Sequence, residues 1–126
     1  MRVPTNWRWF SGQLGDGLCF NAIKVEVLSM RASGGYVYQD GSVEALADWS
    51  YRAELAGIRK GPESVQLSLL TVSGRRLEIC GTTLTNLPVL APAGGQLVIV
   101  NEAHTRFVCG ERAGYGVSEF MEQLAG

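Results

Sequence analysis

Apolar and polar residues alternate with a period of two along much of this chain. Between residues 18 and 30, Ile23, Val25 and Val27 share one face of an extended chain, whereas Lys24 lies on the other. Alternation of this kind is typical of a β-strand with one buried face. The same pattern predicts further strands in the segments 7–14, 65–71, 77–79, 97–109 and 115–120. The chain is therefore expected to be built of strands.

The segment 43–55 allows two interpretations. Its odd positions are mostly apolar or aromatic and include Trp49 and Tyr51, while its even positions include Glu44. A helix that begins at Ser42 is the alternative, because Ala, Leu and Glu are good helix formers. The alternation over the whole segment favours a strand.

Short glycine-containing turns separate most of the predicted strands. Turn signals stand at residues 15–17, 40–41, 73–74 and 110–114. Gly34 and Gly35 are expected to break the chain, so that a short strand follows at residues 36–39. Pro88 and Pro92 are expected to lie in a longer connection, because proline cannot donate a hydrogen bond to a sheet.

These signals together predict the fold class. They indicate about eight strands with short connections, and no spacing typical of a β-α-β unit. Such a chain forms an antiparallel sheet, and closing that sheet into an up-and-down barrel removes its exposed edges. A sandwich of two sheets is the alternative. We predict an all-β fold with one barrel domain over residues 1–126.

Composition narrows the classes of partner. Hydrophobic residues make up 46% of the 126 residues and charged residues only 18%. A low charged fraction indicates that some apolar surface is covered by a partner or closed into a cavity. The formal net charge is −1 and no basic block is present. Nucleic acid is therefore not expected as a partner, since its binding depends on many basic side chains.

Cysteine usage and hydropathy indicate a compartment. Cys19, Cys80 and Cys109 are odd in number, widely spaced and without a CxxC pair. Reduced thiols in the cytoplasm are expected from this pattern, not a disulfide framework or a zinc site. The sequence lacks the apolar core of a signal peptide, and no run approaches the roughly 20 apolar residues that span a bilayer.

Three glycine-containing segments resemble a known family. They are LGDGLCFNA (residues 14–22), GGYVYQDG (34–41) and ERAGYGVSEF (111–120). In this order they are similar to the lipocalin-like (calycin) group of carotenoid 1,2-hydratases and uncharacterised bacterial relatives, in which two barrels stand in tandem. The chain resembles the C-terminal barrel and has no room for the first. The resemblance implies a lipocalin-like barrel, but no catalytic residue and no cofactor is carried over.

Four polar residues are candidates for a ligand site inside the barrel. Asn21 and Asn101 stand among apolar residues of their strands, and Tyr115 shares a face with Glu119. If that face is inward, burial raises the pKa of Glu119, as a general acid requires. The alternatives are two amides that bond to each other, to backbone or to trapped water, and a rim carboxylate paired with an arginine such as Arg112.

Aromatic residues and the single histidine complete the candidates. Trp49 and Tyr51 are assigned either to the core or to the ligand. His104 is a possible acid or base, yet it has opposite parity to Cys109, so the two side chains point to opposite faces of a strand. The alternative for His104 is an ordinary surface residue.

The leading functional hypothesis is a protein that binds a small apolar or amphipathic molecule, because small barrels either fill with side chains or hold one such ligand. Whether it is also an enzyme is left open. The alternatives are a hydratase or isomerase that uses Glu119 or His104, and a filled barrel that acts as an interaction module.

A homodimer is also expected, because the segment 97–100 is apolar on both faces. Val98 or Val100 is predicted at the contact, with Glu102 and Arg106 paired across its rim. In the alternative, residues 121–124 fold over Val98 within one subunit.

Overall fold

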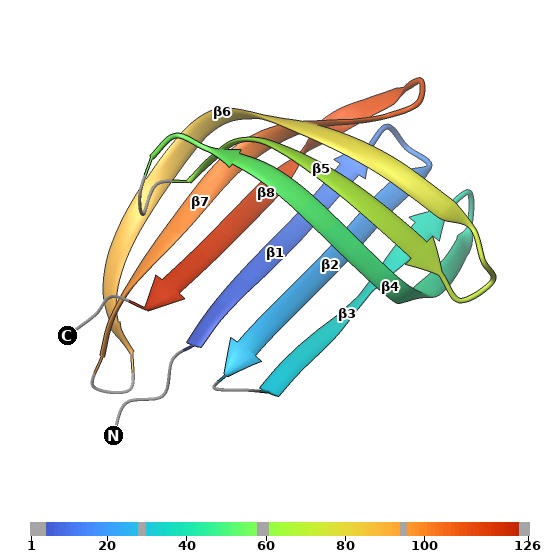
Figure 1. The fold of residues 1–126 in the computed structure, drawn as a ribbon. Coiled ribbons are helices and arrows are strands. Elements are labelled where there is room, and N and C mark those ends of the chain that lie inside the picture. Colours follow the sequence, from blue (N-terminus) through green and yellow to red (C-terminus); the bar gives the residue numbers. More distant parts are fainter. Residues whose placement is uncertain (1–4, 28–29, 58–60, 94–95, 124–126) are drawn as a thin grey trace.

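Eight antiparallel strands follow one another along the chain and close into a barrel (Figure 1). The computed structural model describes residues 5–27, 30–57, 61–93 and 96–123. The strands are β1 (Thr5–Leu14), β2 (Leu18–Val27), β3 (Met30–Gln39), β4 (Ser42–Leu55), β5 (Pro62–Thr71), β6 (Arg76–Ala93), β7 (Gln96–Cys109) and β8 (Arg112–Gln123). Each strand pairs with the next, and β8 pairs with β1. The prediction of an all-β antiparallel barrel is confirmed, and the sandwich alternative is wrong.

The segment 43–55 forms a strand, as its alternation indicates. It belongs to β4, whose pairing with β5 shifts register between Leu46 and Asp48. This bulge keeps both Leu46 and Trp49 on the inner wall, where Trp49 is buried. In the described part of the chain, no helix is long and apolar enough to cross a bilayer.

Gly34 and Gly35 do not break the chain, contrary to the prediction. β3 runs through both and pairs with β2 from Met30 to Gln39. Gly35 has a φ of 145°, and a Cβ at this position would overlap the carbonyl oxygen of Asn21. The glycine therefore permits a close approach of two paired strands instead of ending one of them.

The prolines at positions 88 and 92 lie in a strand as well, not in a connection. β6 extends to Ala93, and Pro88 and Pro92 stand opposite Asn101 and Leu97 of β7. Beyond Thr82, β6 no longer pairs with β5 and becomes an edge strand. Proline is tolerated at an edge, because its missing N–H faces away from the ladder.

Buried side chains occupy the centre of the barrel. Fourteen buried residues from all strands form one cluster, with Phe20 and Phe107 in edge-to-face contact at a ring separation of 5.1 Å. Buried polar groups in the interior form hydrogen bonds with one another. The Thr105 and Ser118 hydroxyls, for example, lie 2.9 Å apart. Most of the interior is therefore closed to a ligand.

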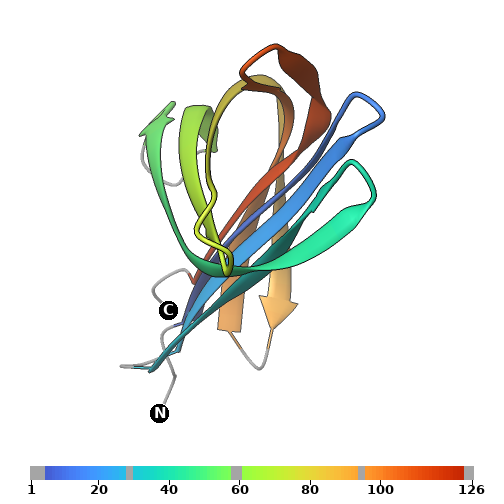
Figure 2. The same ribbon diagram turned by 90° about the vertical axis from the view of Figure 1, so that its right-hand side faces the viewer.

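The barrel is opened along one side between β3 and β4. These strands pair only over residues 36–39 and 42–45, next to their shared hairpin. Beyond it β4 turns away from β3, and both views show the two strands diverging (Figures 1 and 2). We call the gap between residues 30–35 of β3 and residues 46–55 of β4 the open side. It gives access to one end of the barrel interior.

Candidate functional site

The inner wall changes from apolar to polar toward the open side. Lys24, Arg8, Phe120 and Asn101 lie side by side in one inward-facing row across β2, β1, β8 and β7. The next row toward the end of the barrel is mainly polar and contains Glu26, Asn6 and Glu122. A molecule that enters from this end therefore meets charged groups first and apolar groups below them.

Four aromatic side chains form a floor beneath these polar groups, namely Phe10, Trp49, Tyr51 and Phe120. The ring centroids of their contacting pairs are 5.6–6.0 Å apart. Aromatic pairs at such distances contribute about 0.5–1.5 kcal/mol beyond the area that they bury. The floor is therefore a rigid apolar surface, and Trp49 and Tyr51 face inward within it.

Arg8 is held in place by the protein itself. Its Nε donates a hydrogen bond to the Tyr51 hydroxyl at 3.1 Å, and its Nη2 donates to Glu122 at 3.0 Å. Its Nη1 donates to the backbone oxygens of Trp7 and Met121 at 3.0 and 3.4 Å. Arg8 therefore ties β1 to β4 and β8, and its charge is neutralised by Glu122.

Lys24 is held mainly by an aromatic ring. Its Nζ lies 4.7 Å from the centroid of the Trp49 ring, and the Arg8 guanidinium similarly lies 4.4 Å from that of Phe120. Cation–π contacts of this kind contribute roughly 0.5–2 kcal/mol. Among the described residues, Lys24 makes no ion pair. Lys24 is half-buried as a residue, and its positive charge is not neutralised by an ion pair with a described carboxylate.

A pocket of about 320 Å³ opens beside Lys24. Its wall consists of residues 24–26 of β2, residues 31–33 of β3, and Asp48 and Tyr51 of β4. Both acids in this wall have partners. Glu26 faces Arg31 at 3.7 Å. Asp48 accepts a hydrogen bond at 2.8 Å from the Trp49 backbone N–H. The pocket can hold a small molecule whose polar end meets Lys24.

The structure does not bring the four predicted polar residues into one interior. Asn101 faces inward, is 3% exposed and accepts a hydrogen bond from Asn86 at 3.0 Å. Asn21, Tyr115 and Glu119 lie on the outer wall, and Tyr115 is 65% exposed. The shared interior is therefore a wrong prediction for these three, and the two amides do not bond to each other. Even-numbered residues of β2 and β8 face inward, so the expected parity is reversed.

Glu119 belongs to a separate group on the outer wall. The Trp7 Nε1–H donates a hydrogen bond to its Oε2 at 3.0 Å, and Glu102 stands directly opposite it on β7. Burial and the neighbouring Glu102 carboxyl raise the pKa of Glu119, against the Trp7 hydrogen bond. The pairing of Glu119 with Arg112 is a wrong alternative, because Arg112 binds Asp40 at 3.1 Å.

His104 lies on the outer wall too, where it is exposed. It stands between Thr85 of β6 and Val117 of β8 in the sheet. Cys109 faces the core from the same strand, so the predicted opposite parity of the two is confirmed. His104 and Glu119 are therefore separated from the pocket at the open side by the sheet itself.

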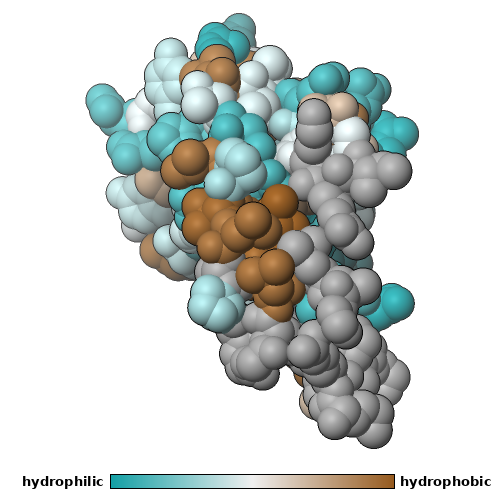
Figure 3. Space-filling view, turned by 90° about the vertical axis from the view of Figure 1, so that its left-hand side faces the viewer, coloured by the Kyte–Doolittle hydropathy of each residue, from teal (hydrophilic) through white to brown (hydrophobic). Residues whose placement is uncertain are grey.

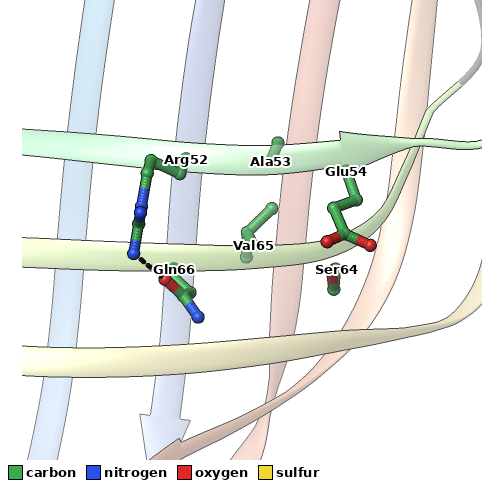
Figure 4. A pocket seen from close by; sticks show the side chains of 6 residues that line it. All are labelled: Arg52, Ala53, Glu54, Ser64, Val65 and Gln66. Carbon is green, nitrogen blue, oxygen red and sulfur yellow. Dashed lines mark hydrogen bonds between the residues drawn. The ribbon is translucent and has the colours of Figure 1, made fainter.

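A second pocket of about 340 Å³ lies along β4 and β5 (Figure 4). Arg52, Glu54, Ser64 and Gln66 line its polar part, and Arg52 donates a hydrogen bond to Gln66 at 2.6 Å. The charged side chains here are exposed and form an ordinary cross-strand surface. This pocket gives no sign of a specific ligand.

A third pocket, of about 600 Å³, is a basin at the far end of the barrel lined by three arginines. Arg75 binds Glu44 at 2.9 Å, and Arg112 binds Asp40. Hydrogen bonds from Ser73 and its neighbours hold the pKa of Glu44 down at about 2. Because Arg75 and Arg112 pair with acids and the lining comes from the β1–β2, β3–β4, β5–β6 and β7–β8 hairpins, the basin is best explained as the junction of these four hairpins.

The described residues contain no group of three or more His, Cys, Asp or Glu side chains placed to hold a metal ion. Sequence reasoning missed Arg8 and Lys24 as site residues. The alternation contains the signal, because Lys24 is on the other face of its strand from Ile23 and Val25, and Arg8 is on the other face of its strand from Trp7. The more apolar parity of each strand indicates the core, and this criterion places Lys24 on the solvent face.

Comparisons with known proteins agree with this fold. The model of a family described as "Domain of unknown function (DUF7064)" matches residues 3–124. Among solved structures, the chain is similar to kievitone hydratase from Nectria haematococca, with a TM-score of 0.64 and 15% sequence identity. The match covers 94% of this chain and 40% of that chain. No curated protein matches the sequence significantly. At this identity the likeness concerns the fold alone.

Proposed function

The chain belongs to the family of domains of unknown function DUF7064, and we propose that it binds a small amphipathic molecule at the open side of its barrel. The observation that carries this proposal is the pocket of about 320 Å³ between the diverging strands β3 and β4, which Tyr51 of the aromatic floor lines. Buried side chains fill the barrel below that floor. The ligand therefore rests on Tyr51 near the barrel end, and does not occupy the central interior.

A more specific ancestry is part of the same proposal. The chain would correspond to one barrel, the C-terminal one, of a longer protein of the carotenoid 1,2-hydratase type. Its support is the fold likeness to a hydratase of which the chain covers 40%. We also propose a reducing compartment such as the cytoplasm, in keeping with the three free thiols of Cys19, Cys80 and Cys109.

Acid catalysis is a second candidate function, favoured by the raised pKa of Glu119 beside Glu102. A general acid must reach the proton that it transfers. Glu119 lies on the outer wall, so it cannot serve a ligand in the pocket at the open side. A hydratase or isomerase that uses Glu119 would need a substrate on the outer wall. Binding at the open side requires no such additional surface.

A thermal-shift screen tests the proposed binding. Neutral, anionic and cationic amphiphiles are added to the protein and to two variants, Ser33→Tyr and Ser50→Tyr. Ser33 of β3 lines the pocket, whereas Ser50 of β4 is exposed on the other face of its strand from Tyr51. We expect at least one compound to raise the melting temperature of the parent protein and of Ser50→Tyr, because a ligand stabilises the state that binds it. In Ser33→Tyr, where the new ring fills the pocket, the rise disappears. A rise that survives in Ser33→Tyr would contradict the proposal.

A further inference from the structure

We infer that the polar end of the ligand is an anion that pairs with Lys24, while its apolar body lies against Tyr51 and the Trp49 side of the aromatic floor. This inference rests on the proposed function, and it specifies the chemical class of the ligand. An aromatic or aliphatic carboxylate, sulfonate or phosphate fits the description.

The distribution of charge at the open side favours an anion. Arg8 is already neutralised by Glu122 and donates hydrogen bonds to four acceptors. Glu26 faces Arg31, whose side chain is exposed. Lys24 is the remaining cation in the pocket wall and forms no ion pair within the described chain, while Asp48 of the same wall already accepts a backbone hydrogen bond.

The placement of Lys24 also favours an anion. Its ammonium lies over the Trp49 ring on the inner wall, and the residue as a whole is half-buried. A lysine on a sheet surface usually carries its charge to water, because hydration of the ammonium is favourable. The Lys24 ammonium lies instead between the pocket and the aromatic floor. An amphipathic anion bound there would place its charged group at the ammonium and its apolar body against the floor.

An unsatisfied donor belongs to the aromatic ring over which the Lys24 ammonium lies. The indole Nε1–H of Trp49 is buried and has no hydrogen-bond partner among the described residues. Buried polar groups normally have a partner, so such a donor calls for an explanation. An anionic oxygen delivered beside Lys24 would supply an acceptor close to this ring. The backbone N–H of Trp49, by contrast, is already bonded to Asp48.

Two fluorescent probes with the same aromatic body test the inference. 1-Anilinonaphthalene-8-sulfonate carries a sulfonate, and N-phenyl-1-naphthylamine is its uncharged counterpart. We expect the sulfonate to bind the parent protein more tightly, and its affinity to fall as salt rises, because salt screens the pair with Lys24. Lys24→Met should weaken sulfonate binding by about tenfold, the loss expected for one charge-assisted contact. Binding of the uncharged probe should not change.

Control variants separate charge from structure. Arg106→Met removes an exposed cation from the outer wall and should leave both affinities unchanged. Lys24→Arg keeps the charge and should keep the preference for the sulfonate. Equal affinity for the two probes, with no effect of salt, would overturn the anion inference and leave the proposed function standing. If no compound gives a stabilisation that is lost in Ser33→Tyr and neither probe binds, the proposed function and the inference both fail. If such compounds exist and neither probe competes with them, the inference fails alone. Should Lys24→Met not fold, the salt dependence of the parent protein decides.

Discussion

Two cations at the open side show how neighbouring side chains divide structural and binding roles. Arg8 has five N–H donors in a fixed plane, and the protein provides acceptors for its guanidinium from β1, β4 and β8. Lys24 has a single ammonium that rests on the Trp49 ring. Removal of Arg8 would break contacts between strands. We expect removal of the Lys24 charge to leave the strand pairing intact.

At this scale, the raised pKa of Glu119 predicts a pH dependence of stability. Between the ordinary pKa of about 4.5 and the raised value, the folded protein holds a proton that the unfolded chain has released. The free energy of unfolding therefore falls as pH rises through this window. Glu119→Gln removes the titrating group, so its stability should decline less. Urea midpoints measured from pH 4 to pH 7 check this.

Glu54→Gln serves as the control for that measurement, because it removes an exposed carboxylate from β4. Its urea midpoints should follow those of the parent protein at every pH. Parallel curves for the parent protein and Glu119→Gln would show that the Trp7 hydrogen bond compensates for burial and for Glu102.

The failure to place Glu119 from sequence has a definite cause. Alternation divides a strand into two faces, but both faces of β1 carry large apolar residues, Trp7 and Trp9 on one and Phe10 and Leu14 on the other. Which face turns inward depends on how β1 pairs with β8, and no local pattern encodes that register. Local alternation alone is enough to predict that Trp49 is buried and that His104 and Cys109 point to opposite faces.

Among the elements, strands with two neighbours were predictable and edge segments were not. β2, β5 and the core half of β7 show clear alternation because one face of each is buried. The end of β6 and the first half of β3 have a neighbour on one side only. Proline and glycine are permitted in such edge segments. They therefore do not end the strand there, although the local sequence pattern predicts a break. The open side itself consists of such edges, which is why it was not foreseen.

The two glycines of β3 provide a matched pair for an element-scale prediction. Gly35→Ala should lower the free energy of unfolding by about 1–3 kcal/mol, because a residue with a side chain is strained at its φ of 145° and its Cβ would meet the Asn21 carbonyl. Gly34→Ala should be nearly neutral, since a Cβ there has open space around it. Urea unfolding of both variants checks this. Equal losses would contradict the assigned backbone.

For the whole molecule, the distribution of apolar surface bears on assembly. Figure 3 shows a patch of apolar side chains on the face that carries the far end of β6 and β7. Exposed apolar residues near this end of β6 and β7 are Leu84, Leu87, Val89, Leu90 and Leu97, of which Leu87 and Val89 share one face of β6. Val98, the predicted contact residue, is only 7% exposed within a single chain. The alternative of residues 121–124 folding over it is wrong for Met121 to Gln123, which continue β8 beside β7.

Homodimer formation remains a proposal, and we now place its contact on this apolar patch. Light scattering at micromolar concentration should give the mass of two chains. Leu87→Asp should reduce it to one, because an apolar contact does not tolerate a buried unpaired charge. Val43→Asp, at an exposed site on the β3–β4 hairpin, should leave the dimer intact. Val98→Asp should destabilise the fold itself. A monomeric parent protein would remove the proposal.

The seam between β1 and β8 has a consequence for the way the chain folds. Trp7 and Glu119 are bonded across 112 positions of sequence, and the whole β1–β8 ladder joins the two ends of the described chain. The hairpins between consecutive strands need only local loop closure, whereas the seam pays the entropy of closing nearly the entire chain. Topologies of this kind fold on the order of milliseconds to seconds. Until the seam closes, β1 and β8 each present an unpaired edge, and this is the interval in which two nascent barrels can pair with each other instead of with themselves.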